Sequence, residues 1–199
     1  MQETEWTRER IVCHAQRCVA RVLETGAWAV DATAGAGHDT VFLARQVGAA
    51  GRVFALDTQR EALARTRQRV QEAGMGERVG LLHAGHEAME TVLPPEAVGR
   101  LGAVMFNLGY LPGGDKAWIT KPETTVAGLD AARRLLAPEG MLSVVAYPGH
   151  PGGAEESAAV RAWGEQRPAG ERVRFVYAAG AEVLAAPWLM LVRNAAATA

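Results

Sequence analysis

The chain has 199 residues, of which 49% are hydrophobic, and its formal net charge is −1 at pH 7. This length supports one sizeable buried core, so we expect a single domain over residues 1–199. The balanced charge argues against a protein that coats nucleic acid without sequence preference, because such binding needs a strongly basic face. The apolar runs are far shorter than the roughly 20 residues that cross a bilayer, and the first residues are charged rather than apolar, so we expect a cytoplasmic protein.

The spacing of cysteine and histidine indicates neither a disulfide nor a metal centre. Cys13 and Cys18 occur in a helical pattern that places them on different faces. The histidines are scattered and have no pair of thiolates beside them, so the sequence predicts no metal site.

An amphipathic helix is predicted near the N-terminus, over about residues 3–25, and Gly26 ends it. One face of this helix is apolar and the other is rich in arginine. We interpret the arginine face as exposed to solvent, with contact to RNA as the alternative. The helix also makes a homodimer a candidate assembly.

After Gly26, short apolar runs alternate with helical patterns, as in the βαβ units that build a parallel sheet. Strands are predicted over 27–30, 52–56, 79–83, 101–106 and 141–147, and helices over 38–47, 61–73, 123–136 and 154–166. Two more strands, over 172–178 and 188–193, have no helix between them and predict an antiparallel hairpin. A seven-stranded, mostly parallel sheet with such a C-terminal hairpin is typical of the Rossmann-like fold of class I S-adenosylmethionine-dependent methyltransferases. Nicotinamide-binding Rossmann domains instead keep their strands parallel.

A glycine turn joins the first predicted strand to the helix that follows it. Gly35 and Gly37 allow a tight turn and a close approach to a ligand at the N-terminus of that helix. Thr40 stands where the dinucleotide fingerprint has its third glycine, and Asp31 would repel a phosphate but suits a cationic amino-acid moiety. We therefore favour a methyl-donor loop over a pyrophosphate loop, and both of these over a purely structural turn.

Polar residues follow the next two predicted strands. Asp57 ends the second strand, where a carboxylate can accept both hydroxyls of an adenosine ribose, and the alternative is that it caps the following helix. His86 follows the third strand, where an adenine ring would lie, with a helix cap or a surface histidine as an equal alternative. The residues predicted to bind the cofactor are Asp31, Thr33, Gly35, Gly37, His38, Asp39, Thr40, Asp57, Gln59, His86, Asn107 and Leu108.

Two further loops follow the fourth and fifth predicted strands. In an open α/β sheet, chemistry gathers beyond the carboxyl ends of the central strands. Asn107 and Tyr110 in the first loop resemble the Asn-Pro-Pro-Tyr loop of amino-group methyltransferases, with other residues in place of the prolines. In the second loop, Tyr147 suits stacking on a base and His150 suits substrate binding or proton transfer, the alternative being a turn with packing aromatics.

Three segments together resemble the bacterial MnmM family, first labelled rRNA methylases. They are residues 31–40 (DATAGAGHDT), 106–116 (FNLGYLPGGDK) and 147–153 (YPGHPGG), and the likeness extends over essentially the whole chain. The resemblance implies transfer of a methyl group from S-adenosylmethionine to the primary amine of 5-aminomethyl-2-thiouridine. This base lies at the anticodon wobble position of tRNA, and the product is the methylaminomethyl form.

The resemblance also implies how the amine is held. Asn107 and the backbone of Leu108 would orient the amine, and Asp115 or His150 would assist the loss of its proton. The sulfonium donor is already activated, so no strong base is required and positioning alone supplies roughly 7–11 kcal/mol.

Contacts to the rest of the tRNA follow from the same resemblance. Tyr110 and Tyr147 would pack against the uracil, while Lys116, Lys121 and the N-terminal arginines would meet phosphates of the anticodon stem-loop. The predicted catalytic residues are Asn107, Tyr110, Asp115 and His150, and the predicted substrate-binding residues are Tyr110, Lys116, Tyr147 and His150.

Other functions fit parts of this pattern. The same fold can act on rRNA, on a protein or on a small amine, because the sequence defines the donor site better than the acceptor site. A nicotinamide-dependent oxidoreductase is disfavoured by Asp31, Thr40 and the terminal hairpin. A non-catalytic RNA-binding module ranks last, because both substrate-side loops are complete.

Overall fold

The computed structural model describes residues 8–109, 120–177 and 186–195. Its helices are α1 (Arg8–Ala20), α2 (His38–Val47), α3 (Arg60–Glu72), α4 (Met89–Val92), α5 (Pro122–Leu135) and α6 (Gly153–Glu165). Its strands are β1 (Trp28–Asp31), β2 (Arg52–Asp57), β3 (Val79–His83), β4 (Leu101–Asn107), β5 (Leu136–Ala146), β6 (Arg172–Val176) and β7 (Trp188–Arg193). Three short 3₁₀ helices are η1 (Gly76–Arg78), η2 (His86–Ala88) and η3 (Pro95–Ala97).

The strands form one seven-stranded sheet in the order β3-β2-β1-β4-β5-β7-β6. The first five strands pair in parallel, and β7 lies antiparallel to both β5 and β6. The predicted C-terminal hairpin is therefore confirmed, and so is the predicted class I methyltransferase fold. The strand order reverses between β1 and β4, which creates the crevice where open α/β sheets bind ligands.

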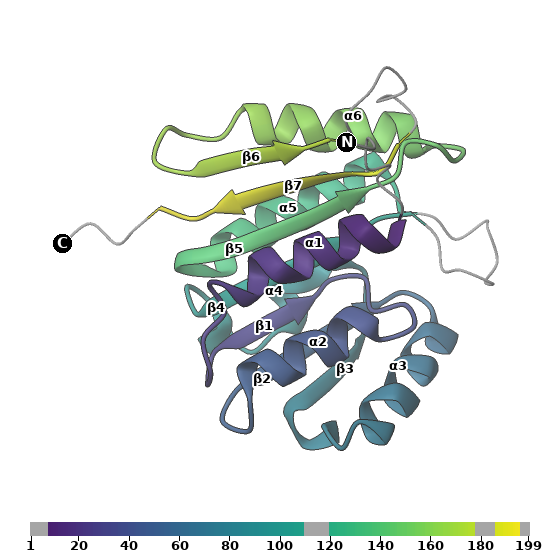
Figure 1. Cartoon of the computed structure of the whole chain (residues 1–199), viewed down its shortest axis with the longest axis vertical. Coiled ribbons are helices and arrows are strands. Elements are labelled where there is room, and N and C mark those ends of the chain that lie inside the picture. The colour runs from purple at the N-terminus through teal and green to yellow at the C-terminus, as the bar shows by residue number, and fades with distance from the viewer. Residues whose placement is uncertain (1–7, 110–119, 178–185, 196–199) are drawn as a thin grey trace, which may run out of the picture.

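Helices cover both faces of the sheet. Figure 1 shows α1 and α2 lying across the near face of the strands, with α5 behind them. One apolar cluster joins α1 and α2 to the sheet, and α3 packs beside them on β2 and β3 through Leu63. A larger cluster on the opposite face includes Phe106 from β4 and Leu129 from α5. Burial on both faces explains the near-continuous apolar runs of the central strands.

The start of β5 differs from the prediction. The sequence predicted a loop over 137–140 and a strand from residue 141, but β5 already begins at Leu136, directly after α5. Leu136 pairs with Leu101, and the register then shifts before Ala103 pairs with Met141. Glu139, in this bulge, has a φ angle of 60°. The sequence showed the turn residues but not that the strand continues through them, because a bulge depends on the neighbouring strand.

The connection between β3 and β4 also contains structure that the sequence did not predict. The helix α4 has four residues, too few for an apolar period to be recognised. No helix among the described residues is both long and apolar enough to cross a membrane. The same part of the chain contains no group of three side chains placed to hold a metal ion.

Candidate active site

The carboxyl ends of four adjacent strands meet at one edge of the sheet. Asp31 ends β1, Asp57 ends β2 and Asn107 ends β4, while Tyr147 directly follows β5. Because these strands are parallel neighbours, the fold brings together side chains that lie as far apart in the sequence as Asp31 and Tyr147. This edge contains the switch point between β1 and β4, where ligands bind in such sheets.

The glycine turn between β1 and α2 is held in a fixed conformation. Gly35 and Gly37 have φ angles of 52° and 79°, and a Cβ atom at Gly37 would lie only 2.9 Å from Cα of Thr66. The Thr66 hydroxyl donates to the Gly35 carbonyl (3.1 Å), and Arg69 Nε donates to the Ala36 carbonyl (2.6 Å). The turn therefore needs glycine for its backbone angles and is tied to α3 before any ligand arrives.

Asp31 is a buried carboxylate beneath this turn, with 1% of its surface exposed. It accepts hydrogen bonds from the Thr33 backbone N–H and from the Thr40 hydroxyl on α2. Burial, together with the nearby charge of Asp39, raises the pKa of Asp31 to about 7. A positively charged ligand group beside Asp31 would favour the ionised carboxylate and lower its pKa, so this site favours binding of a cation.

Asp31 is expected to make the stability of the protein pH-dependent. Its pKa rises from 3.8 to about 7 on folding, so the folded protein holds an extra proton between these values. Its contribution to the free energy of unfolding therefore falls as pH rises from about 4 to 7. In Asp31→Asn, the amide oxygen can accept from Thr33 and the amide nitrogen can donate to Thr40. We expect this variant to raise the melting temperature at pH 8 more than at pH 5, and equal shifts would contradict the prediction.

Asp57 at the end of β2 is half-buried and lies beside the glycine turn. Its two carboxylate oxygens accept the backbone N–H groups of Gly35 (2.9 Å) and Gln59 (2.8 Å). Burial raises the pKa of Asp57, and these hydrogen bonds oppose the rise. The N-cap residue of α3 is Gln59, so the alternative that Asp57 itself caps this helix is wrong. A carboxylate has about four acceptor positions, which leaves capacity for ligand hydroxyls.

Asn107 at the end of β4 lies at the centre of the hydrogen bonds at this edge. Its backbone N–H donates to the Thr33 hydroxyl (2.8 Å), and its amide Oδ1 accepts from the Tyr147 hydroxyl (2.8 Å). Its side chain also forms a hydrogen bond with Asp39; burial raises the pKa of that carboxyl, and this hydrogen bond opposes the rise. The two predicted substrate-side loops therefore meet at Asn107.

The backbone after Asn107 lies against the second loop. Gly109 has a φ angle of 110°, and a Cβ atom there would lie 3.3 Å from Nε2 of His150 and 3.9 Å from Cδ2 of Tyr147. The other ring nitrogen of His150, Nδ1, is 2.9 Å from the Pro151 carbonyl. The structure thus brings Asn107, Tyr147 and His150 together, as the sequence predicted for a shared substrate edge.

A buried acid network that sequence reasoning missed lies under the same loop. Glu156 on α6 is 2% exposed, and its carboxylate accepts hydrogen bonds from the hydroxyls of Thr120 (2.8 Å) and Thr125. The Thr120 hydroxyl in turn accepts the N–H of Gly109 (2.8 Å), and the Thr120 N–H donates to the Gly109 carbonyl (3.1 Å). One signal was available, because Glu156 falls four residues before Val160 on the apolar face of α6.

The structure also places the remaining predicted cofactor residues. His38 is exposed at the first position of α2, Gln59 precedes α3, and Leu108 is buried after β4. Their contacts with a cofactor stay predictions. Tyr110, Asp115 and Lys116 lie outside the described residues.

His86 is not a surface residue, since only 6% of it is exposed. Its ring packs edge-on against Phe106, with centroids 5.4 Å apart, and a Cβ atom at Gly128 would meet its Cδ2 at 2.6 Å. Burial lowers the pKa of His86, while the Ala32 carbonyl accepts a hydrogen bond from it. The structure therefore gives His86 a packing role under the β1 loop, and its predicted adenine contact stays a prediction.

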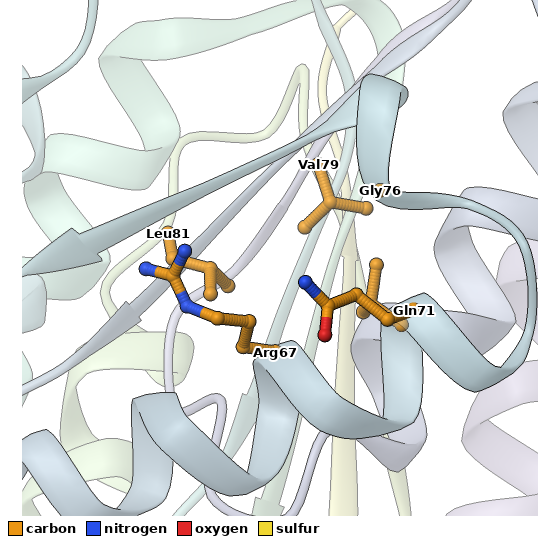
Figure 2. Close-up of a pocket in the computed structure, with 6 residues that line it drawn as sticks. Arg67, Gln71, Gly76, Val79 and Leu81 are labelled. Carbon is orange, nitrogen blue, oxygen red and sulfur yellow. The ribbon is translucent and has the colours of Figure 1, made fainter.

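A hollow elsewhere on the molecule lies between α3 and the edge strand β3. Figure 2 shows Arg67 and Gln71 of α3 facing Val79 and Leu81 of β3 across it. Gly76 and Val79 lie at the amino end of β3, whereas Asp57 and Asn107 end their strands at the opposite edge. This hollow is therefore separate from the candidate active site.

Comparison with known proteins identifies the family. The model of the family described as "Putative rRNA methylase" matches residues 53–193. The chain belongs to this family. The resemblance to the MnmM family, inferred from three sequence segments, is thereby confirmed.

Proteins similar to this chain include a plant protein and two bacterial proteins of known structure. The Arabidopsis thaliana protein named "tRNA (mnm(5)s(2)U34)-methyltransferase, chloroplastic" is 41% identical over 156 residues, or 74% of this chain and 56% of the relative. The chain thus spans little more than half the length of that relative.

The two structures match over nearly their full lengths. A "putative rRNA-methylase" from Clostridium thermocellum is 34% identical with a TM-score of 0.86, over 94% of this chain and 99% of the other. A "putative methyltransferase" from Streptococcus mutans, in complex with S-adenosylhomocysteine (SAH), is 28% identical with a TM-score of 0.80, over the same shares. Close agreement over both whole chains supports the class I methyltransferase fold for the chain described here.

Proposed function

We propose that the protein is an S-adenosylmethionine-dependent tRNA methyltransferase. It transfers a methyl group to the amine of 5-aminomethyl-2-thiouridine at the wobble position and produces 5-methylaminomethyl-2-thiouridine. The observation that carries the proposal is the position of Asn107, which ends β4 beside the glycine turn and faces Tyr147. The name of the Arabidopsis relative, which specifies mnm(5)s(2)U34 in tRNA, supplies the acceptor.

The residues at the switch point fit S-adenosylmethionine. The turn around Gly35 and Gly37 brings the N-terminus of α2 to the switch point, and buried Asp31 favours a positive charge nearby. Asp57, half-buried at the tip of β2, suits the two ribose hydroxyls. The bound cofactor would supply a methyl group on an electrophilic sulfonium. The solved Streptococcus mutans relative, in complex with SAH, supports the same ligand class.

The acceptor amine needs to be held rather than strongly activated. The Oδ1 atom of Asn107 can accept a hydrogen bond from the neutral amine and so direct its lone pair toward the methyl group. The Tyr147 hydroxyl also donates to Oδ1, at 2.8 Å, so the amine and this hydroxyl would bind the same oxygen side by side. Beside it, His150 can accept the proton lost after transfer. Tyr110, Asp115 and Lys116 stay predicted substrate contacts.

The partner in this proposal is the anticodon stem-loop of tRNA in the cytoplasm, and residues 1–199 act as one methyltransferase domain. A wobble base is already unpaired, so presenting it costs less than extracting a base from a duplex. A homodimer built through the N-terminal helix is part of the same proposal.

A defined tRNA substrate tests the function. We expect the purified protein to transfer radiolabelled methyl groups to tRNA that carries 5-aminomethyl-2-thiouridine. Transfer to the same tRNA with an unmodified wobble uridine should be absent, because the acceptor nitrogen is missing. Methylation of rRNA, protein or a free small amine in preference to the modified tRNA would contradict the proposed acceptor. Binding of NAD rather than SAH, measured by calorimetry, would contradict the proposed methyl donor.

A further inference from the structure

A line of hydrogen bonds connects the N-terminal helix to Asn107. The side-chain amide of Gln16 on α1 donates through Nε2 to Oδ1 of Asp39 on α2 (2.7 Å). Asp39 is largely buried, and a second hydrogen bond joins it to the side chain of Asn107. On its other side, Asn107 accepts the Tyr147 hydroxyl at Oδ1. Side chains from α1, α2, β4 and the loop after β5 therefore form one line of hydrogen bonds that includes this amide.

The chemistry of these groups decides which way the amide of Asn107 faces. An ionised carboxylate can only accept hydrogen bonds, so it requires the NH₂ group of Asn107 and turns Oδ1 away from α2. The Tyr147 hydroxyl on the opposite side agrees, because it donates to Oδ1. An asparagine amide is otherwise free to rotate by half a turn, which exchanges its acceptor for a donor.

Gln16 stabilises Asp39 as the ionised acceptor for the NH₂ group of Asn107. The donated hydrogen bond from Gln16 lowers the pKa of Asp39, against the rise that burial causes. It also ties Oδ1 of the Asp39 carboxylate to α1. Neither Gln16 nor the contact from α1 to α2 follows from the glycine motif, in which Asp39 was predicted only as a cofactor contact.

We infer that Gln16 and Asp39 are positioning residues that fix the Asn107 amide with Oδ1 toward the acceptor amine. This inference rests on the proposed function, because a reversed amide would present NH₂ to an amine that needs an acceptor. It gives the N-terminal helix a part in turnover that is separate from any contact with RNA.

Two substitutions test the inference by kinetics. Gln16→Leu removes the donor at nearly constant volume, and Asp39→Asn allows either orientation of the Asn107 amide. We expect kcat to fall about tenfold in the first and up to about a hundredfold in the second, because misplacement of a reacting group has effects of this size. In Gln16→Leu, the KM for tRNA and the affinity for SAH should change by less than about threefold, and the melting temperature by a few degrees.

Gln68→Leu is a matched control for the chemical change. Gln68 also donates to a carboxylate, Glu72, at 2.8 Å, but this pair is exposed on α3 away from the site. The control should keep the kcat of the wild type. A loss in Gln16→Leu that appears wholly in SAH affinity or in folding, or an unchanged kcat, would overturn the inference.

Nuclear magnetic resonance tests the orientation without tRNA. In the wild type with SAH, the side-chain NH₂ protons of Asn107 should show stronger Overhauser contacts to the Hβ protons of Asp39 than to the ring protons of Tyr147. In Asp39→Asn this preference should be lost. Equal or stronger contacts to Tyr147 in the wild type would overturn the inference whatever the activity. If the expected contacts appear but the wild type methylates no tRNA, the proposed function fails while the orientation stands.

Discussion

Replacing Asn107 with Ala is expected to lower kcat about 100-fold to 1,000-fold, the usual cost of removing one preorganised polar contact to the reacting centre. The variant keeps the backbone N–H that donates to Thr33, so the end of β4 should stay in place. It loses the amide oxygen, which accepts the Tyr147 hydroxyl and, in our proposal, also contacts the acceptor amine. The affinity for SAH, measured by calorimetry, should change by less than about threefold.

The control for this variant is Asn194→Ala, the same chemical change at the opposite edge of the sheet. Asn194 donates to the carbonyls of Leu136 and Ala137 at the start of β5, far from the carboxyl ends of the strands. It should lower stability without changing kcat for the folded fraction. If Asn107→Ala loses SAH affinity and kcat to the same degree, Asn107 contributes to cofactor binding rather than to the orientation of the amine.

Replacing Glu156 with Ala is expected to reduce both stability and activity. The buried hydroxyl of Thr125 and the half-buried hydroxyl of Thr120 would lose their acceptor, and an unsatisfied buried group costs about 1–3 kcal/mol. The melting temperature should fall by roughly 2–4 °C for each kcal/mol lost in a chain of this size. Because Thr120 also holds the Gly109 backbone, kcat/KM for tRNA should fall about tenfold.

Two further variants separate the network from general effects on α6. Glu156→Gln keeps one acceptor oxygen, and a threonine hydroxyl can rotate to accept from the new NH₂ group, so most stability and activity should return. Glu155→Ala changes the exposed neighbour on the same helix and should leave both quantities near those of the wild type. Equal losses in Glu155→Ala and Glu156→Ala, in thermal unfolding and in the tRNA assay, would rule out the network as the cause.

The two residues in these predictions differ in how readily the sequence reveals their importance. Asn107 is visible in the sequence because it ends an apolar strand, where the carboxyl edge of the sheet makes a polar side chain informative. Glu156 is one of two adjacent glutamates, and only its burial against Thr125 distinguishes it from Glu155. The same substitution at two neighbouring positions of one helix therefore has different expected effects.

The sequence alone determined the order of the seven strands and of the longer helices, the C-terminal hairpin and the ends of the strands that carry Asp31, Asp57 and Asn107. These features follow from local rules, since apolar periodicity and turn chemistry act over a few residues. The glycine turn was predictable for the same reason, because Gly35 and Gly37 adopt the positive φ angles that a tight strand-to-helix turn needs.

The tertiary structure decided which of these groups touch and what each is able to do. Gln16 meets Asp39 across 23 residues of sequence, Glu156 meets Thr120 across 36, and Tyr147 meets Asn107 across 40. His86 is buried against Phe106, and the bulge that starts β5 depends on Leu101. Contacts of this kind leave no period or motif along the chain, because they form only when separate elements pack against the same sheet.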